Sequence, residues 1–87
     1  MTYYFTAMGS RSHAFLLENR FKIENIKCEL TYIPREIMVD LCNMGVKFEE
    51  SELERAVSVI RRSGLPGCRV YRQIIYPYGY QYDQILI

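Results

Sequence analysis

The sequence has no tryptophan, only one histidine and almost no net charge, since its 87 residues sum to +1. Proteins that bind nucleic acids through phosphate contacts usually show a clear basic excess, which this chain lacks. No apolar run approaches the ~20 residues that span a bilayer. The segment from Met1 to Phe5 has neither a positive leader nor a small-residue cleavage site, so no secretory signal is indicated. We therefore expect a cytoplasmic protein without nucleic-acid or membrane partners.

Cysteine is present, but not in a pattern that indicates disulfides or a metal site. The three residues Cys28, Cys42 and Cys68 are widely spaced, and no two of them form a CxxC pair. An odd number of cysteines at wide spacing is not typical of a disulfide framework. A structural zinc site would require all three thiols and His13 to converge. We expect no metal and no other cofactor.

The hydrophobic fraction of 49% is ordinary for one small globular domain. Residues 2–8 are rich in β-favouring side chains and predict a first strand. Gly9 ends that strand, and Ser10 or Ser12 can cap the helix that follows. The buried stripe of this helix is predicted to contain Ala14, Leu17 and Phe21, widened by Leu16 and Ile23. Asn25 is predicted to end it.

The middle of the chain predicts two strands and a second helix. Residues 27–33 alternate as a half-buried strand does, and Pro34 ends this strand. Residues 36–43 form a loop with room for one helical turn, and residues 44–48 form the next strand. The segment Ser51 to Glu54 fits a capping box. The second helix then has a predicted buried stripe of Leu53, Ala56, Val57 and Ile60, and it ends at Gly64.

The C-terminal part predicts a hairpin. Residues 68–75 form a strand, and the sequence from Tyr76 to Gly79 is typical of a type I turn. Residues 80–87 have strand composition and would add a fifth strand; the alternative is a loose tail. The tyrosines at positions 76, 78, 80 and 82 alternate, so we expect them to share one face and to cover the sheet or a partner chain.

This order of elements predicts an α+β fold, a ferredoxin-like β-α-β-β-α-β sandwich with an added C-terminal hairpin strand. The ferredoxin-like domain would cover residues 1–75, and the tyrosine-rich hairpin or tail would cover residues 76–87. The first two strands run parallel in this topology, so their C-terminal ends share one edge of the sheet. The turn at Gly9 and the loop of residues 34–43 should therefore be neighbours.

This predicted juxtaposition places a candidate site around Cys42. The N-terminus of the first helix carries a partial positive charge, and Arg35 and His13 are expected nearby. Such surroundings lower the pKa of a thiol and also suit a small anion. We expect Cys42 to be the reactive thiol and Arg35 to stabilise its thiolate. The expected binding residues are Ser10, His13, Pro34 and Asn43. The alternative is a buried, inert Cys42, because free cysteine often fills cores.

The same residues carry a resemblance to a known family, the Se/S carrier-like proteins. The segment from Gly9 to Ala14 resembles the turn and helix start of that family, and the segment from Tyr32 to Ile37 resembles its Pro-Arg-x-Ile segment. The segment from Cys42 to Phe48 resembles its cysteine and the strand that follows. The resemblance runs from about Tyr3 to Tyr71. The chain departs from the family pattern by having the residues Met38 to Leu41 where serines are usual, and Asn43 where glycine is usual.

The resemblance implies a carrier or accessory protein of sulfur or selenium metabolism, with the chalcogen held on Cys42. Its partners would be sulfur or selenium donor and acceptor proteins. Carrier chemistry of this kind does not make the chain a full enzyme. The alternative is a non-catalytic interaction module that forms a homodimer through its sheet or its tyrosine-rich C-terminus. A small-molecule enzyme ranks third, because no paired carboxylates, base–nucleophile pair or phosphate loop is apparent.

Overall fold

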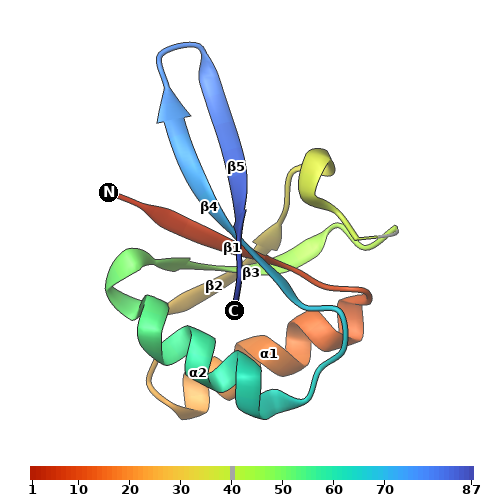
Figure 1. The fold of residues 1–87 in the computed structure, drawn as a ribbon. Helices are drawn as coiled ribbons and strands as arrows, with labels where there is room; N and C mark the ends of the chain where they lie inside the picture. Colours follow the sequence, from red (N-terminus) through yellow and green to blue (C-terminus); the bar gives the residue numbers. More distant parts are fainter. Residues whose placement is uncertain (40) are drawn as a thin grey trace.

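The computed structural model describes residues 1–39 and 41–87, so Asp40 of the expected 34–43 loop lies outside the described residues. In these described residues, two α-helices and a five-stranded antiparallel sheet make up the α+β fold (Figure 1). The strands are β1 (Tyr3–Ala7), β2 (Cys28–Tyr32), β3 (Met44–Glu49), β4 (Arg69–Tyr76) and β5 (Gly79–Ile85). The helices are α1 (Arg11–Ile23) and α2 (Leu53–Ser63), with single 3₁₀ turns η1 (Arg35–Ile37) and η2 (Glu50–Glu52).

The strand order is β2-β3-β1-β4-β5, which is compatible with a ferredoxin-like arrangement that has one strand added at its edge. Both β1 and β2 pair antiparallel with β3. They are therefore parallel to each other, as predicted, although β3 lies between them. Their C-terminal ends lie at the same end of the sheet, where β3 and β4 begin.

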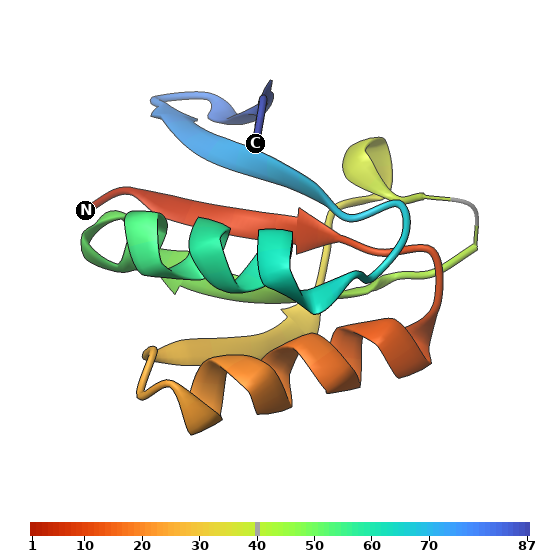
Figure 2. The same ribbon diagram turned by 60° about the horizontal axis from the view of Figure 1, so that its bottom comes forward.

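Both helices cover one face of the sheet (Figure 2), and the main core lies between the two layers. This cluster comprises Tyr4, Met8, Ala14, Leu17, Phe21, Ile26, Val46, Phe48, Ala56, Val59, Ile60 and Val70. The predicted stripe of α1 is confirmed at Ala14, Leu17 and Phe21. The predicted widening was wrong, because Leu16 is 51% and Ile23 is 69% exposed. A helix on one face of a sheet buries only a narrow stripe.

The ends of the two helices agree with the sequence in three places and differ in one. Ser10 caps α1, Asn25 adopts a left-handed φ of 59°, and Gly64 ends α2 with φ 70°. The predicted capping box was wrong, since α2 begins only at Leu53 and its N-cap makes no side-chain hydrogen bond.

A tertiary contact replaces the predicted capping box. The Glu52 carboxylate accepts a hydrogen bond from the Lys27 backbone N–H at 2.6 Å and another from Arg55 at 3.0 Å. It therefore ties α2 to the start of β2. The buried stripe of α2 contains Val59, whereas Val57 is only half-buried.

The other face of the sheet carries a smaller cluster. Phe5, Ala7, Ile33 and Ile37 are buried together, with Met38, Val39, Tyr71 and Tyr82 packed around them. The segment that follows β2 therefore folds over this face instead of projecting into solvent. The single helical turn predicted in residues 36–43 is present as η1, one residue earlier than expected.

The C-terminal hairpin is confirmed: β4 and β5 pair from Val70–Ile85 to Tyr76–Gly79. The four tyrosines do not share one strand face, because Tyr78 lies in the turn and stacks on Tyr76. Tyr82 packs edge-on against Phe5, with ring centroids 5.7 Å apart. No helix in the described part of the chain is long and apolar enough to cross a membrane.

Candidate functional site

The candidate site lies at the end of the sheet where β1 and β2 end and β3 and β4 begin. Figures 1 and 2 both show the start of α1, η1 and the start of β3 at this end of the molecule. The topology therefore places both loops at the same end of the sheet, and a direct contact between them stays a prediction.

At the start of α1, Ser10 has a structural role. Its Oγ accepts a hydrogen bond from the His13 backbone N–H at 3.2 Å, which satisfies one of the unpaired donors of the first turn. The His13 side chain is half-buried, and among the described residues its Nδ1 atom has no hydrogen-bond partner. The helix start is thus fixed in place.

The segment from Ile33 to Asn43 is closed and anchored. The Ile33 N–H donates to the Asn43 carbonyl at 2.9 Å, which brings the two ends of the segment together. Pro34 precedes η1, and its carbonyl accepts from the Ile37 N–H at 3.1 Å. Ile33 and Ile37 are buried on Phe5, whereas Arg35 is exposed. The apolar residues thereby anchor the segment and leave Arg35 in solvent.

Cys42 lies in this segment just before β3. Its backbone N–H donates to the Val39 carbonyl at 3.3 Å, and its thiol donates to the Met44 carbonyl at 3.5 Å. The side chain is half-buried and belongs to neither apolar cluster. In the described part of the chain, no hydrogen bond or ion pair joins Cys42 to Arg35 or His13.

The other two thiols have different surroundings. Cys28 and Cys68 both pack against the main core. Burial raises the pKa of Cys68 to about 11. Burial also raises the pKa of Cys28, and the carboxylate of Glu18 adds to that effect. A raised pKa lowers the thiolate fraction of a thiol, so both residues are less reactive than an ordinary cysteine.

Two residues that the sequence reasoning did not single out shape this end of the sheet. Thr6 is fully buried, and its Oγ1 accepts a hydrogen bond from the Val46 N–H at 2.8 Å. At Gly45, a Cβ atom would overlap the Thr6 carbonyl and also contact Ile33 Cγ2. Glycine at position 45 therefore allows β3 to approach the Thr6 carbonyl closely and allows Ile33 to pack directly over this position. A lone glycine inside a strand pattern was the available signal, since it often marks a close backbone approach.

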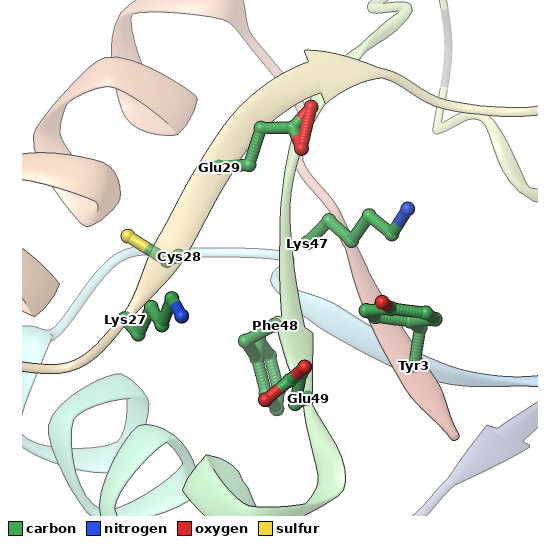
Figure 3. Close-up of a pocket in the computed structure, with 7 residues that line it drawn as sticks. All are labelled: Tyr3, Lys27, Cys28, Glu29, Lys47, Phe48 and Glu49. Carbon is green, nitrogen blue, oxygen red and sulfur yellow. The ribbon is translucent and has the colours of Figure 1, made fainter. Parts of the chain in front are cut away.

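A separate hollow of about 310 Å³ lies at the β2–β3 edge (Figure 3). Its lining residues are Tyr3, Lys27, Cys28, Glu29, Lys47, Phe48 and Glu49. The Lys47 Nζ atom lies 4.2 Å from the centroid of the Tyr3 ring, in a cation–π contact. Figure 3 shows the Cys28 thiol on the other side of β2 from Lys47. None of the expected site residues lines this hollow.

Metal ligands do not gather in the described residues, where no group of three or more His, Cys, Asp or Glu side chains could hold an ion. The expectation of a site without a metal therefore stays a prediction, based on the chemistry of a single thiol.

Comparison with known proteins gives one match. Residues 3–72 match the family model described as Putative Se/S carrier protein-like. The match includes both helices, β1 to β3, and the whole segment from Pro34 to Asn43. No curated protein and no solved structure matches the chain.

Proposed function

Because the chain belongs to the Putative Se/S carrier protein-like family, we propose that it is a small carrier of sulfur or selenium that holds the chalcogen on Cys42. The observation that carries the proposal is the contrast among the three thiols. All three thiols are half-buried, but Cys28 and Cys68 pack on the main core, whereas Cys42 lies in the loop before β3 and packs with neither apolar cluster of the described residues. A carrier thiol must be reached by the proteins that load and unload it.

The proposed step conserves atoms and electrons without an added oxidant. The Cys42 thiolate attacks the outer sulfur of a persulfide on a donor protein, and a new S–S bond forms at Cys42 Sγ. The donor S–S bond breaks, and the donor leaves as a thiolate that takes up a proton. Exchange of this kind requires the attacking sulfur to be deprotonated. The acceptor protein would remove the outer sulfur by the same exchange.

Arg35 and the start of α1 are the proposed sources of positive charge. The Cys42 thiol donates a hydrogen bond to the Met44 carbonyl, and deprotonation removes that bond. A compensating positive charge would favour the thiolate. Arg35 is exposed on η1, between the same two strands as Cys42, and its long side chain would turn toward the thiolate. Ser10 would hold the helix start, while Pro34 and Asn43 would hold the loop.

Site-resolved alkylation tests this proposal. We expect a slow alkylating reagent at pH 7 to modify Cys42 at least about tenfold faster than Cys68, because a thiol with a raised pKa has little thiolate. The Arg35→Ala variant should slow the modification of Cys42, and Arg35→Lys should preserve most of it. Arg61→Ala, a change on the surface of α2, is the matched control. Peptide mass spectrometry gives the rate at each cysteine.

Loading with a small-molecule persulfide is the second measurement. The wild type should gain the mass of one sulfur atom on the Cys42 peptide, and Cys42→Ser should gain none. The proposal is wrong if Cys42 reacts no faster than Cys28 and Cys68, or if sulfur loads equally on all three.

A further inference from the structure

The two edges of the sheet differ in how well they are protected. Natural proteins guard an exposed edge strand with short length, charges, proline or a cover, because its unpaired backbone groups recruit other strands. At one edge, β2 has five residues, includes Glu29, and is followed closely by Pro34. At the other, β5 has seven residues, a single charge at Asp83, and neither lysine nor proline.

The backbone of β5 offers hydrogen-bonding groups to a partner strand. Tyr76 and Gly79 flank a two-residue turn and pair with each other, as the first and last residues of a β-turn do. Because hydrogen-bonded and non-hydrogen-bonded pairs alternate along an antiparallel ladder, Gln81 and Asp83 then face β4. The N–H and C=O groups of Tyr80, Tyr82 and Gln84 consequently point away from the sheet. Figure 1 shows the hairpin reaching beyond the other strands.

We propose that β5 pairs antiparallel with β5 of a second copy of this chain, about a twofold axis at Tyr82. The two five-stranded sheets would join into one continuous sheet. Tyr82 then lies opposite Tyr82 of the second copy, and aromatic cross-strand pairs are favourable. A twofold contact of this kind is closed, so it produces a dimer and not a fibre.

Charge and overlap select this register. With the axis at Tyr82, all seven residues of β5 overlap, and Asp83 faces Gln81 of the second copy. Within one chain the Gln81 Nε2 atom already donates to Asp83 Oδ1 at 3.1 Å, so both side chains lie on the same face. A shift of the axis to Asp83 would place two carboxylates directly opposite each other, which is unfavourable. The β5 edge is therefore complementary to itself in one register.

This interface is independent of the carrier chemistry, and sedimentation velocity of the purified full chain tests it. We expect wild-type protein at tens of micromolar to have twice the mass of its 10.3 kDa chain. Gln84→Pro removes one outward N–H without disturbing the β4–β5 ladder, since edge strands accept proline where the N–H faces solvent. This variant should be monomeric. Gln84→Thr keeps the N–H and should remain dimeric.

A second variant keeps the test decisive if the proline weakens folding. Gln81→Asp places a carboxylate opposite Asp83 of the second copy at two symmetry-related points, and should weaken the dimer about tenfold at low salt. Gln81→Asn is the neutral control, and far-UV circular dichroism checks the fold of each variant. A wild-type monomer, or a Gln81→Asp dimer as tight as that of Gln81→Asn, would overturn the proposal.

Discussion

The two faces of the sheet are covered by different kinds of structure. Two helices cover one face over a large buried cluster. In the described part of the chain, the segment after β2 and Tyr82 pack on the other face, over a cluster with four buried residues. Two thiols pack on the first cluster, whereas Cys42 lies in the segment between β2 and β3, part of which packs on the second.

This difference separates stability from the proposed chemistry. The larger buried cluster is on the helix face, and burial there raises the pKa of Cys28 and Cys68. The smaller cluster holds the segment between β2 and β3 in place. A substitution in that segment should leave the packing of the main core intact. We therefore expect substitutions on the two faces to have different consequences for stability and for thiol reactivity.

The largest effect is expected on the helix face. Phe48 is 2% exposed and packs with Tyr4 and Phe21. Phe48→Ala should reduce the free energy of unfolding by about 3–5 kcal/mol, through lost burial and the cavity left behind. Urea unfolding measures the change. Phe15→Ala, at a position that is 50% exposed, is the control and should cost much less. Equal losses for the two variants would contradict the location of the core.

A smaller effect is expected on the other face. Ile37 is 3% exposed and anchors η1 on Phe5. Ile37→Ala should cost about 2 kcal/mol, near the lower end of the range for such changes, because the cluster is small. It should also raise the alkylation rate of Cys42 relative to that of Cys68, since the segment loosens locally. Leu41→Ala, at an 89% exposed position of the same segment, is the control. An equal increase in the alkylation rate of Cys68 would show that Ile37→Ala loosens both faces of the sheet, and would contradict this prediction.

The smallest effect is expected at the start of α1. Ser10→Ala removes the hydrogen bond from the His13 N–H and should cost about 1 kcal/mol, as is typical for the loss of an N-cap. Ser12 is the second residue of α1 and is exposed, so Ser12→Ala should reduce the free energy of unfolding by less. Thermal unfolding compares the two. If Ser12→Ala costs more, Ser12 and not Ser10 is the cap.

Local patterns predicted much of the fold. The spacing of Ala14, Leu17 and Phe21 identified the buried side of α1, and Gly64 identified the end of α2. The turn residues after Tyr76 identified the hairpin. Each of these features depends on residues a few positions apart, so a single sequence carries the necessary information.

Contacts between segments that are distant in the sequence could not be predicted from such local patterns. Ser51 and Glu54 fit a capping box by their sequence, but the side-chain contact at the start of α2 is made by Glu52, whose carboxylate accepts from the Lys27 N–H before β2. The close approach of Gly45 to Thr6, and the folding of Ile33 over that position, likewise join three separate segments. For the candidate site, the sequence predicted the relation between two loops, but not which residues anchor them.

By itself the sequence determined the order of helices and strands and the buried stripe of α1. It also showed that residues 34–42 resemble the Pro-Arg-x-Ile segment and cysteine of a known family. Only the tertiary structure decided that this segment covers the second face of the sheet, that Cys28 and Cys68 pack on the main core whereas Cys42 does not, and that β5 is an edge strand. The physical reason is that periodicity and capping depend on neighbours along the chain. Burial of a thiol and exposure of a strand edge depend instead on which distant segments pack against them.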